Sequence, residues 1–226
     1  MGIIIAILLF SFIIIFHELG HFLLAKANGI RVDEFSLGLG PTLIGKKIGG
    51  TKFCIKLLPF GGACMMGEDD ADDMSEGSFN SKSVWARISV IAAGPAFNLI
   101  LAWIFCVIII LSVGYRSPEI SGVSEGYSAA EQGMQAGDVI KEINGRNVHI
   151  WDDVSLYTLT HPNETSLEVV YERDGEEYTA VIEPRQLEGD TTPKLGVTSG
   201  EVVKPGLLGA FQYGAYTVKY WINYTF

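Results

Sequence analysis

The stretch Phe16-His17-Glu18-Leu19-Gly20-His21-Phe22 decides the fold, because it lies within an apolar run that covers residues 2–25. A helix that crosses a bilayer needs about 20 apolar residues, and the first fifteen residues hold nothing more polar than Ser11. A second run, residues 88–113, contains no ionisable group. A cleaved signal peptide would begin with basic residues, yet no Lys or Arg precedes Lys26. We therefore predict two retained transmembrane helices, 2–25 and 88–113.

The His-Glu-x-x-His pattern predicts a metal site inside the first of these helices. His17 and His21 lie one helical turn apart, so both imidazoles can bind one ion, and Glu18 can take a proton from a metal-bound water. Ionisable groups in an apolar span cost several kcal/mol unless they are paired or bound to metal. The alternative is a short helix that ends at Phe16, with the motif among the lipid headgroups, but residues 22–25 continue the apolar pattern. The pattern favours a zinc hydrolase site in the membrane, near its cytoplasmic side.

Charge is distributed unevenly along the 226 residues, whose formal net charge is −10. Residues 114–206 alone carry seven basic and seventeen acidic side chains. Because DNA- and RNA-binding surfaces need clustered Lys and Arg to neutralise phosphates, this composition excludes nucleic acid as the main partner. The mean hydropathy of +0.28 argues against an ordinary soluble enzyme.

Basic residues also predict the orientation in the membrane. They flank the connection between the two apolar runs at Lys26, Arg31 and Arg87, whereas Arg116 stands alone beyond the second run. The positive-inside rule then places residues 26–87 in the cytoplasm and the N-terminus and residues 114–206 outside. The odd number of cysteines, with none in the outside segment, indicates free thiols rather than a disulfide framework; they are Cys54, Cys64 and Cys106.

Four stretches together resemble the site-2 protease family of intramembrane zinc metalloproteases. Residues 16–22 are similar to its first-helix signature, and residues 34–41 (EFSLGLGP) to its glycine-rich segment. Residues 58–68 resemble its membrane-associated β-hairpin, and residues 93–98 (AGPAFN) its Gly-Pro-x-x-Asn motif. The resemblance is to the bacterial type that carries a PDZ domain and acts in regulated intramembrane proteolysis of anti-sigma factors. It implies Zn²⁺ as cofactor and a location in a bacterial cell membrane as a multi-pass protein.

The segment before the second helix shows strand periodicity. Phe53, Ile55 and Leu57 alternate with polar residues, and glycine pairs at 49–50 and 61–62 punctuate the ends. A free strand edge beside a catalytic metal can bind an extended peptide by main-chain hydrogen bonds, so we predict that these three residues contact substrate. An ordinary half-buried hairpin is the alternative.

Asn98 lies within the second apolar run and must find a hydrogen-bond partner there. Structural bonding between two helices is one possibility. The resemblance implies instead that Asn98 faces the active site and holds substrate or the developing oxyanion. The nearby Gly94-Pro95 pair would loosen or kink the helix.

Residues 114–200 read as a small α+β domain that resembles a PDZ domain of the bacterial protease type. We expect a strand at residues 120–123, a tight turn at residues 143–145 and a hairpin closed by Asp174-Gly175. PDZ domains bind an extended peptide along a sheet edge. The resemblance implies that a loop in a circularly permuted PDZ domain holds the terminal carboxylate of that peptide; its residues are Leu195, Gly196 and Val197. We expect the remaining histidines, His149 and His161, at surface or turn positions.

The predicted metal site lacks one ligand. A catalytic zinc has three protein ligands and an open position for water, and the family takes the third from an Asp in a later Leu-Asp-Gly motif, which this sequence does not contain. Residues 201–226, rich in aromatics, are expected to begin an interfacial or transmembrane helix. We therefore expect residues 1–113 to be the first part of a longer protease core. The acidic run at residues 68–73 is expected to be a solvated loop.

The fold class that follows is a membrane protein with an α-helical transmembrane core, a membrane-associated β-hairpin and a small α+β PDZ-like domain. The expected function is that of an intramembrane zinc endopeptidase that cleaves single-span substrates such as anti-sigma factors, with His17 and His21 on zinc and Glu18 as the catalytic base. The alternative is a non-catalytic, membrane-anchored PDZ protein that binds peptides and uses its histidines structurally.

Overall fold

The computed structural model describes residues 2–67, 72–186 and 194–225. Residues 68–71 of the acidic run therefore lie outside it. The chain forms two compact units, residues 1–102 and 103–226, and helix α2 (Val84–Val113) contributes to both. The first unit also contains helix α1 (Gly2–Ala27) and strands β1 (Glu34–Ile48) and β2 (Thr51–Met65).

Both predicted apolar helices are confirmed, α2 beginning four residues earlier than expected. Among the described residues these two are the helices long and apolar enough to cross a membrane. Their apolar side chains are mostly exposed: 6% of the most apolar window of α1 and 17% of that of α2 is buried. A core helix of a soluble protein would bury most of such a window, so these surfaces are suited to lipid.

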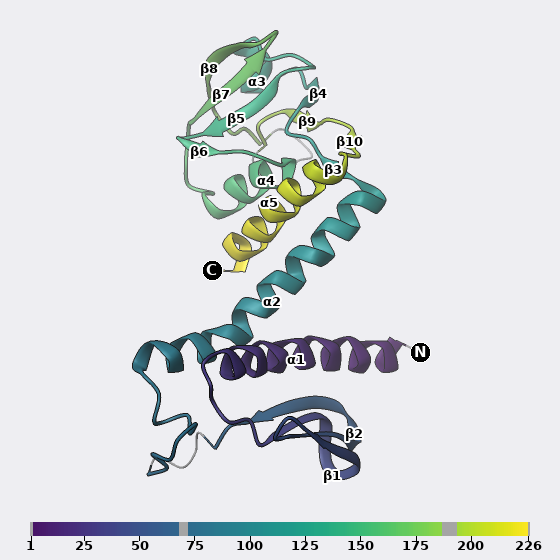
Figure 1. Ribbon diagram of the computed structural model, residues 1–226. Helices are drawn as coiled ribbons and strands as arrows, with labels where there is room; N and C mark the ends of the chain where they lie inside the picture. The colour runs from purple at the N-terminus through teal and green to yellow at the C-terminus, as the bar shows by residue number, and fades with distance from the viewer. Residues whose placement is uncertain (1, 68–71, 187–193, 226) are drawn as a thin grey trace. The chain divides into compact units, whose positions relative to one another are not determined.

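A close crossing brings α1 against α2 within the first unit. A Cβ atom added to Gly20 of α1 would lie 2.6 Å from the backbone oxygen of Ala93 in α2, so only glycine fits there. Small residues allow helices to approach this closely in membranes. Helix α2 continues through Pro95, although Pro lacks the N–H of an intrahelical bond, and its ribbon changes direction within its first half (Figure 1).

Each of the two long strands of the first unit contributes two separate segments to the sheet. Residues 34–37 pair on one side with residues 52–55 and on the other with residues 62–65, while residues 42–48 pair with residues 51–56. The turn at Gly49-Gly50 is confirmed, with φ values of 56° and 86°. The glycine pair at 61–62, however, does not end the strand as predicted, because residues 62–65 continue it and complete the sheet.

Side chains of α1 attach the sheet to the helix. The Ser11 hydroxyl donates to the carbonyl of Pro59 at 3.0 Å, and α1 packs along β2. The sheet and helix share a core centred on Phe22, Phe35 and Phe53, whose ring centroids are 5.3–6.0 Å apart. At the base of the sheet, the Glu34 carboxylate is bonded to the ammonium groups of Lys52 and Lys56, at 2.8 and 2.7 Å.

The second unit contains the predicted α+β domain. Its main sheet has the strand order β6-β5-β7-β8, and a separate pair is formed by β4 and β9. The predicted strand at 120–123 and the turns at Asn144-Gly145 and Asp174-Gly175 are confirmed. Its elements are β3 (Tyr115–Arg116), β4 (Ile120–Val123), α3 (Ser128–Glu131), β5 (Val139–Ile143), β6 (Arg146–Asn147), α4 (Trp151–Thr160), β7 (Leu167–Arg173), β8 (Glu176–Ile182), β9 (Val197–Ser199), β10 (Val202–Val203) and α5 (Leu207–Thr225).

One buried ion pair joins the main sheet to the turn before it. Asp138, which is 1% exposed, accepts two hydrogen bonds from the Arg173 guanidinium, at 2.6 and 2.8 Å, and a third from the backbone N–H of Gln135. Burial opposes ionisation of this carboxyl, but the Arg173 hydrogen bonds outweigh it and lower the pKa of Asp138 below its ordinary value. The helix predicted within residues 201–226 is confirmed as α5, and it packs on the second half of α2, where the Trp103 indole N–H donates to the Phe211 carbonyl.

Candidate metal centre

The two imidazoles of α1 direct their Nε2 atoms to one place. The ring centroids of His17 and His21 are 4.8 Å apart. Helix α2 passes this face at Gly94, and a Cβ atom added to Gly94 would lie 2.5 Å from the Nε2 atoms of both rings. Zinc–nitrogen bonds are about 2.0–2.1 Å long. The space that glycine leaves open thus fits an ion bound by both Nε2 atoms.

The Nδ1 atoms of the same rings contact α2. His21 Nδ1 lies 2.7 Å from the carbonyl oxygen of Val90. A carbonyl only accepts, so His21 donates from Nδ1–H, and the lone pair of its neutral ring is on Nε2. His17 Nδ1 lies 3.1 Å from the amide nitrogen of Asn98. Histidines that bind metals are commonly held through their other nitrogen in this way.

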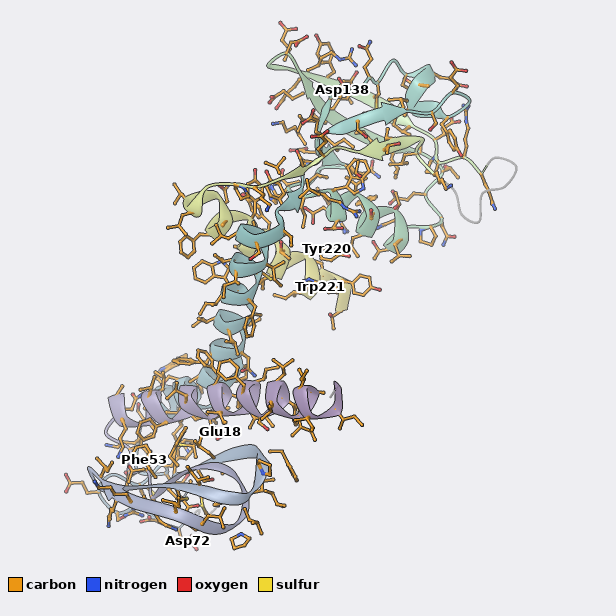
Figure 2. All side chains as sticks on the ribbon, turned by 90° about the vertical axis from the view of Figure 1, so that its right-hand side faces the viewer. Glu18, Phe53, Asp72, Asp138, Tyr220 and Trp221 are labelled. Atoms are coloured by element: carbon orange, nitrogen blue, oxygen red, sulfur yellow. The ribbon has the colours of Figure 1, made fainter. Side chains whose placement is uncertain are left out.

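Glu18 lies on the side of α1 that faces the sheet (Figure 2). Its Oε2 atom accepts a hydrogen bond from the backbone N–H of Cys64 in β2, at 2.9 Å. A Cβ atom added to Gly62 would lie 3.6 Å from Glu18 Cγ, an ordinary contact distance, so this part of β2 passes directly beside the Glu18 side chain. The carboxylate is thus adjacent in sequence to His17 and fixed against the nearest strand.

The strand segment nearest to Glu18 is residues 62–65, not residues 53–57. In the described part of the chain, residues 62–65 pair with a strand on one side only, whereas residues 52–55 have paired neighbours on both sides. Phe53 packs in the aromatic core described above, while Ile55 and Leu57 are about half exposed. Phe53 and Ile55 therefore do not lie at a free strand edge, and contact of Phe53, Ile55 and Leu57 with substrate stays a prediction. The alternating pattern identifies a strand but does not tell a central strand from an edge.

The described residues contain no group of three or more His, Cys, Asp or Glu side chains that could hold a metal ion. Within the described chain, the centre consists of two imidazoles with Glu18 beside them. Sequence reasoning did not identify two of its residues, Gly94 and Cys64. Gly94 contributes the space of a missing side chain and Cys64 a backbone N–H, and neither leaves a side-chain signal in the sequence.

A second candidate site lies in the other unit, between α4 and β9. It is a cavity of about 440 Å³. The predicted loop residues Leu195, Gly196 and Val197 line one side, and α4 contributes Trp151 and Val154 to the other. In the described part of the chain β9 pairs only with β4, and Val197 and Thr198 of β9 also line this cavity.

The two remaining histidines are half-buried and stacked on tyrosines. His161, at the turn after α4, stacks on Tyr157 with the ring centroids 4.3 Å apart. His149 stacks on Tyr216 of α5 at 3.8 Å. Burial and the nearby Lys219 lower the pKa of His149, although Asp153 opposes them.

A glutamate between two histidines one turn apart is typical of zinc-dependent peptidases, and the geometry of α1 and Gly94 agrees with that class. Residues 5–222 match Peptidase family M50, and the chain belongs to this family. The resemblance to site-2 proteases is thereby confirmed, and membership implies Zn²⁺ as the cofactor.

Curated relatives agree with this assignment. A protein of Clostridium perfringens is 38% identical over 95% of this chain and 63% of its own length, and one of Clostridium acetobutylicum is 35% identical over 94% and 62%. Both names contain the words "zinc metalloprotease". Zinc metalloprotease RasP of Bacillus licheniformis is 29% identical over 92% of this chain and 70% of its own length. The chain spans about three fifths of the length of the first two relatives.

Among solved structures, the PDZ domain of the SdrC-like protein of Listeria monocytogenes aligns with 38% of this chain and 90% of its own, at 23% identity and a TM-score of 0.34.

Proposed function

We propose that this chain carries the metal-binding and proton-transferring part of an intramembrane zinc endopeptidase. The observation that supports it most directly is the convergence of His17 and His21 Nε2 on the space beside Gly94, in a helix apolar enough to cross a membrane. Zinc, when bound, supplies Lewis-acid activation of water and of a peptide carbonyl. His17 and His21 hold the ion, and Glu18 takes a proton from the attacking water and delivers it to the leaving amine.

The substrate strand is proposed to add to the edge formed by residues 62–65. This edge lies beside Glu18, and the N–H of Cys64 points outward from the sheet. Strand addition would present a peptide bond in extended form, as hydrolysis requires, because a helical segment hides its carbonyls. Phe53 has a structural role in this proposal, as part of the core under the sheet.

The domain in residues 114–200 is proposed to be PDZ-like and to bind an extended peptide between α4 and β9. Leu195, Gly196 and Val197 line that cavity at the end where a terminal carboxylate would be held. From the family resemblance we propose single-span membrane proteins, such as anti-sigma factors, as the substrates of the whole protein. The proposed topology places the N-terminus and this domain outside a bacterial cell membrane and residues 26–87 in the cytoplasm.

Replacing Glu18 by Gln in the full-length protein tests the proposed catalytic base. We expect cleavage of a single-span substrate to fall by a factor of about 100 or more, because a general base contributes 10²–10⁴-fold. Zinc content should stay the same, since Gln removes no ligand. Glu76→Gln, at an exposed glutamate in the connection between α1 and α2, is the matched control and should cleave at the wild-type rate.

Persisting turnover in Glu18→Gln would refute the assignment of the base. The non-catalytic alternative predicts instead that the wild-type protein shows no chelator-sensitive cleavage and binds peptide with or without zinc. One equivalent of zinc, lost in His17→Ala, would contradict that alternative.

A further inference from the structure

The amide of Asn98 has one polar atom without a partner. Its Nδ2 atom lies 3.1 Å from Nδ1 of His17, while its Oδ1 atom is buried and has no hydrogen-bond partner in the described structure. A buried carbonyl oxygen that is left without a hydrogen-bond partner destabilises the structure that buries it. In this arrangement Asn98 donates, so His17 Nδ1 must accept with its lone pair and the ring proton must be on Nε2.

That proton would occupy the position on His17 that faces Gly94. His21 shows the opposite arrangement, because its Nδ1–H donates to the carbonyl of Val90 and its Nε2 lone pair is free. A metal ion beside Gly94 needs the lone pairs of both Nε2 atoms. When the ion is bound, His17 must therefore carry its proton on Nδ1 and must donate toward Asn98.

The two ends of a carboxamide have nearly the same shape, so rotation about the Cβ–Cγ bond exchanges their positions. After this rotation Oδ1 of Asn98 accepts from Nδ1–H of His17, which removes a contact between two donors. We propose that Asn98 is a positioning residue, whose Oδ1 atom holds His17 in the tautomer that binds zinc through Nε2. This inference rests on the proposed zinc site. It gives Asn98 a different role from the substrate or oxyanion contact that the family resemblance implies.

Two variants separate these roles. Asn98→Asp keeps an acceptor oxygen beside His17 but removes the two N–H donors of the amide. Asn98→Leu removes the acceptor oxygen as well as the donors and keeps a similar side-chain volume. For a positioning residue we expect Asn98→Leu to weaken zinc binding by about 10–100-fold, the usual effect of losing such a partner, and Asn98→Asp to bind zinc at least as tightly as the wild type. Affinity is measured by competition with a chromophoric chelator in the detergent-solubilised protein.

Ring ¹⁵N spectra give a readout that is independent of activity. The chain has four histidines, so the resonances can be assigned with single His→Ala variants. In the zinc-loaded wild type and in Asn98→Asp, Nδ1 of His17 should be protonated and protected from exchange with solvent. In Asn98→Leu that protection should be lost. Leu99→Ala, a half-exposed neighbour on α2, is the matched control and should match the wild type in both measurements.

Unchanged zinc affinity in Asn98→Leu would overturn the proposal, as would loss of zinc in Asn98→Asp. Loss of cleavage in Asn98→Asp, with zinc affinity unchanged in both variants, would assign Asn98 to the substrate instead. If His17→Ala binds zinc as tightly as the wild type, the proposed zinc site itself fails, and this result is distinguishable from all the others.

Discussion

Three residues of the centre follow from helix geometry alone, because a spacing of four places His17 and His21 on one face and Glu18 beside them. Gly94 is different, since its contribution is the absence of a side chain at a helix crossing. Its sequence context, Gly-Pro-x-x-Asn, predicts a loosened helix and says nothing of two imidazoles on a neighbouring helix. Such contacts depend on where two distant segments cross, which the local sequence does not determine.

We predict that Gly94→Ala abolishes zinc binding and leaves the helix intact. The added Cβ would occupy the point 2.5 Å from both Nε2 atoms, while alanine is the better helix former at a helical position. Zinc content and helix content by circular dichroism are measured on the same sample. Gly2→Ala is the control, because a Cβ at Gly2 of α1 meets nothing within 4 Å. Full zinc occupancy in Gly94→Ala would contradict the proposed position of the ion.

At the scale of elements, the helices could be predicted closely, and the sheet could be predicted only in part. Apolar runs of this length have one solution in a bilayer, the helix. The sheet depends instead on pairing between distant segments. A glycine pair in such a sheet can either form a turn or bend a strand that continues. Gly49-Gly50 forms the turn, whereas Gly61, at a φ of 80°, bends a strand that continues to Met65. Because β2 continues past Gly61, residues 62–65 pair with residues 34–37 and become the edge of the sheet.

The pairing of Glu34 with two lysines predicts how the sheet responds to acid. Hydrogen bonds from Lys52 and then from Lys56 lower the pKa of Glu34 from 4.5 to about 2. A carboxyl with a lowered pKa stabilises the folded sheet fully above its unfolded value, and this contribution is lost as the pH falls from about 4.5 toward 2. Hydrogen exchange of residues 34–65, measured between pH 5 and pH 2.5, should therefore show decreasing protection after correction for intrinsic rates. Glu34→Gln should lack this component, and identical pH profiles for the two proteins would contradict the prediction.

At the scale of the whole chain, the candidate centre lies entirely within the first compact unit, residues 1–102. His17, Glu18, Cys64, Gly94 and Asn98 all belong to it, so the proposed zinc binding can be measured separately from the peptide binding proposed for the second unit. The sequence motifs predict this separation of the two proposed functions, because each motif falls within one unit. The motifs do not predict which substrate is bound, because peptide recognition by strand addition depends largely on main-chain hydrogen bonds.

The proposed orientation can be tested with single cysteines. The native thiols give little background, because Cys54 and Cys64 are buried and Cys106 lies within α2. We predict that a membrane-impermeant maleimide labels Glu125→Cys in intact spheroplasts, whereas Glu76→Cys reacts only after the membrane is opened. Both positions are exposed, so access depends on the side of the membrane. The reverse pattern would invert the topology.

The hydrogen bond between Glu18 and Cys64 has a consequence for the timing of the proposed catalysis. An edge strand has a limited set of outward N–H groups, and Glu18 already uses the one of Cys64. A peptide that adds to residues 62–65 needs that same donor, so its arrival and the departure of the Glu18 carboxylate are one exchange. Without a substrate strand, the proposed base stays engaged with the backbone. In the proposed protease, the sheet would thus hold the base inactive until a substrate strand takes over the N–H of Cys64.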